Sequence, residues 1–244
     1  MPEPSAMRPD PPPARRRPAL RILLLLALAP LLAAAIAPGR TAPELERLGW
    51  RKVLWQGIAP PAFTATPGDG VRVQGRGQAA FLYRPVQGQA TCLAWRWRVD
   101  AGPPATDLAR RGGDDRALAV AVGFTGFGPA AGFAARAQHG LAQAAAGDHV
   151  LPRSVLSYVW GGEARPGFQP SPWAPAISRL RVLRPAGTPR GVWQEERVDL
   201  AADWRRAFGD APVPPLREVA IATDTEDTGA AVDARVEAIR LEPC

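Results

Sequence analysis

The chain has 244 residues, of which 46% are hydrophobic and 22% charged, and this composition excludes both a disordered tail and a bundle of membrane spans. The formal charge of +7 comes almost entirely from arginine, since Lys52 is the only lysine, and no basic stripe interleaved with aromatic residues marks a nucleic-acid-binding face. Two cysteines and two histidines are too few for a zinc ribbon, an iron–sulfur site or a disulfide-dense scaffold.

An N-terminal targeting segment is the first element predicted. A proline- and arginine-rich stretch is followed by an apolar run from Ile22 to Ala37. This run is shorter than the roughly 20 apolar residues that a spanning helix needs, and small residues follow it. A basic head with a short apolar body is typical of a secretory signal. We therefore expect residues 1–42 to be a signal peptide with a basic, proline-rich region, and the protein to be exported to the periplasm or the extracellular space. An uncleaved anchor is the alternative, and no other membrane contact is expected.

Residues 43–244 are predicted to form one all-β domain, because short apolar segments recur between proline- and glycine-rich breaks. The predicted strands, in chain order, are 51–56, 71–75, 79–84, 91–99, 116–124, 155–160, 177–184, 192–199, 216–223 and 232–241. Two segments have helical character: the alanine-rich stretch 130–146, and 201–208, which Gly209 ends. This pattern indicates a β-sandwich with short helices.

Three of these strands have a bulky face and a small-residue face, because successive side chains of a strand point to opposite sides. In 92–99 the bulky face carries Leu93, Trp95, Trp97 and Val99, and the segments 115–124 and 218–224 alternate in the same way. We expect the bulky faces to form the core. Two interpretations are open for the small faces: either the alanine-rich helix covers them, or they line a shallow cleft. The edges of that cleft would carry Arg96, Arg98, Asp115, Glu218 and Asp224.

A pair of acidic residues precedes the strand 116–124 in the sequence Gly112-Gly113-Asp114-Asp115. Short carboxylates accept backbone N–H bonds in turns, which is the structural interpretation of this motif. The functional interpretation is a carboxylate pair at the end of a sheet that binds a cation or the hydroxyl groups of a sugar.

A second acidic segment, Thr223 to Gly229, ends the strand 216–223 and contains Asp224 and Asp227. Calcium binds six to eight oxygens, so a calcium site is one interpretation. It is not an EF-hand, because Arg235 stands where the loop requires an acidic residue. A turn held by side-chain hydrogen bonds is the alternative.

Aromatic residues offer a third signal. Tyr158 and Trp160 share one face of the strand 155–160, where they either stack on sugar rings or fill the core. Trp173, in a proline-rich loop, is a further candidate for an exposed stacking platform.

Known catalytic motifs are absent: the sequence has no nucleophile elbow, phosphate-binding loop or zinc-protease helix. A glycosidase built from two carboxylates remains an alternative, with Asp114 or Asp115 facing Asp224 or Asp227. In an oxidising compartment Cys92 and Cys244 either form a disulfide or remain a buried thiol and an exposed one.

Several motifs together resemble a known family. They are Leu93-Ala94-Trp95-Arg96-Trp97-Arg98-Val99, Gly113-Asp114-Asp115, Leu156-Ser157-Tyr158-Val159-Trp160 and Thr223-Asp224-Thr225-Glu226-Asp227-Thr228-Gly229. In this order they resemble domain-of-unknown-function family 3047, exported bacterial proteins with no established activity, over roughly residues 45–242. Ala117 and Ala119 stand where that family commonly has a larger or basic residue, and Glu226-Asp227 replaces an aspartate–asparagine pair. The resemblance implies a jelly-roll-like β-sandwich similar to carbohydrate-binding modules, with one or two short helices.

These observations favour an exported, non-catalytic domain that binds a glycan or another cell-envelope component. The predicted ligand-binding residues are Arg96, Arg98, Asp114, Asp115, Tyr158, Trp160, Asp224 and Asp227. A carboxylate-dependent envelope hydrolase is one alternative, and a structural or partner-binding periplasmic module is the other. No cofactor other than calcium is considered, and no nucleic acid is expected as a partner.

Overall fold

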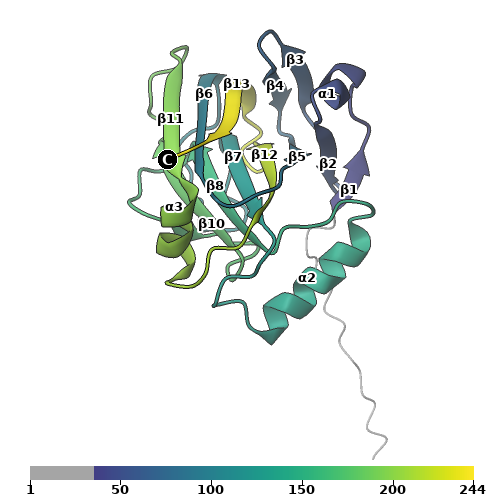
Figure 1. Ribbon diagram of the computed structural model, residues 1–244. Coiled ribbons are helices and arrows are strands. Elements are labelled where there is room, and N and C mark those ends of the chain that lie inside the picture. The colour runs from purple at the N-terminus through teal and green to yellow at the C-terminus, as the bar shows by residue number, and fades with distance from the viewer. Residues whose placement is uncertain (1–35) are drawn as a thin grey trace, which may run out of the picture. The chain divides into compact units, whose positions relative to one another are not determined.

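The computed structural model describes residues 36–244, which form two facing β-sheets (Figure 1). The large sheet has the order β1 (Ile36–Gly39), β2 (Arg51–Trp55), β5 (Ala79–Pro85), β12 (Leu216–Asp224), β7 (Arg116–Phe124), β8 (Ser154–Trp160), β10 (Ser178–Arg184) and β9 (Gln169–Pro170). The small sheet has the order β11 (Gln194–Asp199), β6 (Cys92–Ala101), β13 (Ala231–Glu242), β4 (Gly70–Arg76) and β3 (Ala62–Thr66). The pairing of β8 with β10 is parallel, while the neighbouring pairs β7–β8 and β12–β7 are antiparallel. The domain is thus a jelly-roll-like β-sandwich, as predicted.

All ten predicted strand segments are strands, and both predicted helices are present as α2 (Phe133–Ala145) and α3 (Leu200–Phe208). The additional elements are the short strands β1, β3 and β9 and the five-residue helix α1 (Pro43–Arg47). These pieces are too short to show a clear period in the sequence. Pro43 opens α1, where the missing N–H of proline is no loss.

The core lies between the sheets and is built from the predicted bulky faces. Trp95 is 2% exposed and Trp97 0%. Their rings meet edge to face at 5.4 Å, and Trp97 meets Trp160 of the opposite sheet at 5.5 Å. Each large apolar side chain buried in this way contributes about 1.5–3 kcal/mol. The core predicted from the alternation of side chains along the strands is therefore confirmed.

The small-residue face of the large sheet is not covered by the alanine-rich helix, so that expectation was wrong. Helix α2 has no buried side chain and contacts β1. Loops lie on this face instead. Leu108 packs with Ala119, and His149 stacks on Tyr83 with its Nε2 atom 2.7 Å from Glu218.

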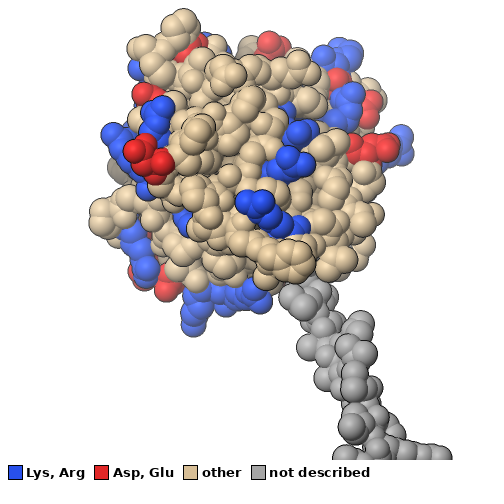
Figure 2. Space-filling view, turned by 60° about the horizontal axis from the view of Figure 1, so that its bottom comes forward, with Lys and Arg blue, Asp and Glu red and all other residues tan. Residues whose placement is uncertain are grey.

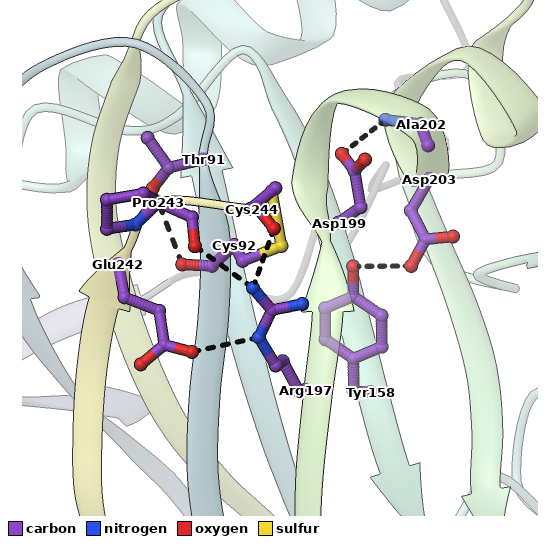
Figure 3. Close-up of a disulfide and its surroundings, with 10 residues drawn as sticks. All are labelled: Thr91, Cys92, Tyr158, Arg197, Asp199, Ala202, Asp203, Glu242, Pro243 and Cys244. Atoms are coloured by element: carbon purple, nitrogen blue, oxygen red, sulfur yellow. Dashed lines mark hydrogen bonds and ion pairs between the residues drawn. A yellow bond between two sulfur atoms is a disulfide. The ribbon is translucent and has the colours of Figure 1, made fainter.

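A disulfide joins Cys92, at the start of β6, to Cys244, so the paired interpretation of the cysteines is confirmed (Figure 3). Arg197 of β11 lies beside the bond. Its guanidinium donates to the Glu242 carboxylate and to the carbonyl oxygens of Pro243 and Cys244. The end of β13 is therefore held to the sheet by one covalent bond and by this ion pair.

Most of the predicted signal segment, residues 1–35, lies outside the described residues. Strand β1 falls within the expected segment 1–42, yet it pairs with β2 from Ile36 to Gly39, so the sheet begins upstream of residue 43. None of the helices in residues 36–244 is long and apolar enough to cross a membrane.

Candidate functional site

Strand pairing brings the two acidic segments together at one end of the large sheet. Asp114 and Asp115 lead into β7, and Asp224 is the last residue of β12. These strands are antiparallel neighbours with Asp224 opposite Arg116, so the start of one meets the end of the other. We call Asp114, Arg116, Trp173 and Asp224 the carboxylate site.

Asp115 has a structural role beside this site. It is 0% exposed and accepts hydrogen bonds from the backbone N–H groups of Asp227 and Thr228 at 3.3 and 2.8 Å, and from the Thr228 hydroxyl at 2.5 Å. Because these bonds use both carboxylate oxygens, Asp115 ties the β12–β13 turn to β7. This geometry matches the turn interpretation of Asp115 and places Asp227 in that turn.

Arg116 lies between the two remaining carboxylates. Its Nη1 atom is 3.6 Å from Asp114 and 3.5 Å from Asp224, and it also donates to the Asp114 carbonyl at 2.9 Å. Both carboxylates are largely buried, with side chains 5% and 16% exposed. One guanidinium thus supplies the only close positive charge for two buried acids within the described residues.

Two buried polar atoms of the carboxylate site have no hydrogen-bond partner within residues 36–244: Asp224 Oδ1 and Arg116 Nε. Burial raises the pKa of Asp224 to about 7; Arg116 opposes this shift, and Asp114 and Asp115 add to it. Near neutral pH this carboxyl group therefore exists in both protonation states. It can donate a hydrogen bond or accept one.

Trp173 supplies an aromatic surface next to the acids. Its indole N–H donates to Asp114 at 3.0 Å, and its side chain remains 40% exposed. The guanidinium of Arg111 lies 4.9 Å from the ring centre and donates to the Pro172 carbonyl. The signal in the sequence was a tryptophan in a proline-rich loop, but its partner Asp114 lies far away in the chain.

Tyr158 and Trp160 do not belong to this site. They are 0% and 1% exposed and pack in the core, so neither ring has an open face for a ligand, and the expected stacking role is corrected. The Tyr158 hydroxyl donates to Asp203 at 3.0 Å. Burial, together with the Asp203 charge, raises the pKa of Tyr158 well above its ordinary value.

Arg96 and Arg98 are also placed elsewhere, on the outer face of the small sheet. Arg96 forms an ion pair with Glu237 of the neighbouring strand β13, and Arg98 binds Asp100 at 2.6 Å. The expectation that these arginines edge one cleft with the acidic residues was wrong. Alternation showed correctly that they face away from the core, but it could not show which sheet would contain β6.

Metal binding gains no support from the geometry. Within residues 36–244, no group of three or more histidine, cysteine or acidic side chains is placed to hold a metal ion. The position between Asp114 and Asp224 is taken by Arg116, and Asp115 is committed to backbone N–H groups. Calcium therefore stays a prediction from the sequence.

Two hollows lie away from the carboxylate site. One of about 370 Å³ is lined by 85–88, Thr125 and 215–217, and one of about 130 Å³ lies beside Trp50 and Arg84. Neither is lined by a residue of the carboxylate site. Trp173, bonded to Asp114, is the exposed part of the carboxylate site.

Comparison with known proteins places the chain in a family. A search of curated proteins found no match. Among solved structures, the chain is similar to the xyloglucanase domain of NopAA, a type three effector from Sinorhizobium fredii, in complex with cellobiose. That match has 10% identity and a TM-score of 0.42, and covers 84% of this chain and 97% of the other, a likeness too distant to bear on activity. The family model described as "Protein of unknown function (DUF3047)" matches residues 49–240, and the chain therefore belongs to that family.

Proposed function

We propose that this domain is an exported, non-catalytic binding module that holds a glycan or another hydroxyl-rich component of the cell envelope at the carboxylate site. The observation that carries the proposal is the pair of buried atoms without partners, Asp224 Oδ1 and Arg116 Nε, next to the exposed ring of Trp173. Buried polar atoms in proteins nearly always have partners. A ligand with neighbouring hydroxyl groups would donate to the carboxylate and accept from the guanidinium.

Trp173 supports a sugar as the ligand class. An indole ring offers a flat apolar surface whose edge carries a donor. Here the donor is engaged by Asp114, which fixes the ring in place. A pyranose ring has the matching character, with C–H groups on its faces and hydroxyl groups at its rim.

Export is supported by the Cys92–Cys244 disulfide, because such bonds persist in oxidising compartments. An envelope location would give the site access to glycans on the side of the membrane where they are assembled into walls and coats.

The test is binding of the purified full chain to a glycan array and to isolated peptidoglycan. Trp173→Ala is expected to weaken binding by about 2- to 12-fold, since aromatic contacts of this kind contribute about 0.5–1.5 kcal/mol. Trp193→Ala is the matched control, because Trp193 also lies under an arginine, Arg96, at 4.9 Å, but directly before β11 of the small sheet. Equal binding by both variants would refute the assignment of the site.

A second candidate function is favoured by one observation, the pKa of about 7 at Asp224. A carboxyl group that keeps its proton near neutral pH can act as a general acid, and Asp114 lies across Arg116 from it. The envelope hydrolase is therefore tested with the same glycans. Release of reducing ends that stops in Asp224→Asn, while binding persists, would replace the binding module by an enzyme.

A further inference from the structure

Helix α2 presents its apolar face to solvent, the reverse of a helix that packs on a soluble domain. Phe133 is 89% exposed and Leu141 73%, and no residue of the helix is buried. Two polar side chains, His139 and Gln143, face the protein instead. Gln143 donates to the His149 carbonyl at 2.9 Å and accepts from the Leu151 N–H at 2.8 Å, and His139 Nε2 lies 3.1 Å from the Pro152 carbonyl.

The exposed apolar residues form one stripe. Phe133, Ala137, Leu141 and Ala144 recur at helical spacing, so their side chains share a face. Val150, 55% exposed, follows in the loop after the helix. In a helix that packs on a globular domain, such a stripe faces the core. Because this stripe faces the solvent, it is available to bind another partner.

The helix itself carries only a basic charge, while one acidic residue, the exposed Asp148, lies in the loop between the helix and Val150. Helix α2 contains no aspartate or glutamate, and Arg136 lies exposed beside the stripe. The guanidinium groups of Arg136 and Arg153 both lie against Phe127, at 5.3 and 5.7 Å from its ring centre. Figure 2, viewed from the side of α2, shows a broad uncharged surface crossed by basic groups, with acidic groups near its margin.

We propose that α2 and Val150 form a membrane-surface face that rests on an anionic phospholipid bilayer. An apolar stripe flanked by arginine is the composition of a helix that lies in the lipid interface. The position of α2 in the chain favours lipid as the partner. The apolar run Ile22 to Ala37 leads directly into β1, and β1 is the strand that α2 contacts. In a chain that keeps this run as an uncleaved anchor, the most apolar part of the sequence therefore joins the domain beside this helix.

This placement gives the domain an orientation. His139 of α2 lies against the carbonyl oxygen of Pro152. Two residues further along, Ser154 pairs with Phe124 at the end of β7. The carboxylate site lies at the other end of β7, beside Arg116. Nine residues of strand separate the two by about 26 Å. The carboxylate site would point away from the lipid, although the membrane proposal does not depend on any ligand there.

The test attaches an environment-sensitive fluorophore to a cysteine introduced at Ala137→Cys in the full chain, with the native disulfide intact. Vesicles of phosphatidylethanolamine and phosphatidylglycerol are expected to shift its emission to the blue, and vesicles of phosphatidylcholine much less. The control is the same label at Val192→Cys, which is also exposed, at 50%, but precedes β11. This readout reports the face that touches lipid even if the apolar run also binds vesicles.

Phe133→Ser with Leu141→Ser provides the second measurement. The double variant should reduce the response of the label at least tenfold in apparent lipid affinity, with thermal stability unchanged because both side chains are exposed. An unshifted label at residue 137 overturns the proposal. A shift that grows with protein concentration in the absence of vesicles also overturns it, because it would assign the stripe to a second copy of the chain.

Discussion

Two buried aspartates, Asp203 on α3 and Asp224 at the end of β12, differ in how fully they are paired. Asp203 of α3 is 1% exposed and accepts from the Tyr158 hydroxyl at 3.0 Å (Figure 3). It also binds Arg181 and Arg206, each at 3.1 Å. Asp224 shares one guanidinium with Asp114, and its Oδ1 atom has no partner within the described residues. Asp203 thus contacts two arginines and a hydroxyl donor, whereas Asp224 shares its one arginine with Asp114.

This difference separates structure from function in the same sandwich. A fully paired buried carboxylate fixes α3 against β8 and leaves nothing for a ligand. An incompletely paired one destabilises the fold in its charged form, as the raised pKa of Asp224 indicates, and keeps hydrogen-bonding capacity open. Proteins tolerate such groups chiefly at functional sites. Three sets of substitutions test this contrast between the two aspartates.

Removal of the disulfide, which lies near the start of α3, should have the largest effect on the free energy of unfolding. Cys92→Ser with Cys244→Ser opens a loop of 152 residues, which is expected to cost about 4–5 kcal/mol in the free energy of unfolding. Urea unfolding of the oxidised parent and the double variant measures it. A loss below about 1 kcal/mol would mean that the Arg197 contacts alone hold the end of β13.

Asp203→Ala should cost about 3–5 kcal/mol, because it leaves Arg181 and the buried Tyr158 hydroxyl without their partner. The matched control is Asp233→Ala, which breaks an ion pair with Arg72 on the small sheet, where the side chains are 25% and 31% exposed. That change should cost about 1 kcal/mol or less. Similar losses in the two variants would remove the contrast between a paired interior and an ordinary surface.

Asp224→Asn should instead stabilise the protein by about 2–4 kcal/mol above pH 7. The pKa of Asp224 is raised in the folded state, from 3.8 to about 7, so folding favours its protonated form. The stability that this proton contributes is present below pH 4 and is lost as the pH rises to about 7. The variant, with no proton to lose, should flatten that part of the stability profile in chemical unfolding from acid to neutral pH. A difference in stability between variant and parent that does not grow as the pH rises over this range would contradict the raised pKa.

The strands and their two faces could be predicted from the residues alone. The period of two along β6, β7 and β12 assigned Trp95 and Trp97 to the core and the arginines of β6 to the outside. Alternation is a local property of the chain, because the pleat sends neighbouring side chains to opposite sides whatever the strand pairs with. It also revealed the two acidic segments, since each adjoins the end of a strand.

Which of these residues contact one another could not be predicted from the residues alone. Alternation cannot say whether Tyr158 and Trp160 face the other sheet or the solvent, and packing against Trp95 and Trp97 placed them inside. The pairing of Asp114 with Trp173 joins loops 59 residues apart. Register between β7 and β12 set Asp224 opposite Arg116. Such contacts depend on the order of strands in a sheet. That order is set by the free energy of the whole chain, so no single segment carries a periodic pattern that indicates it.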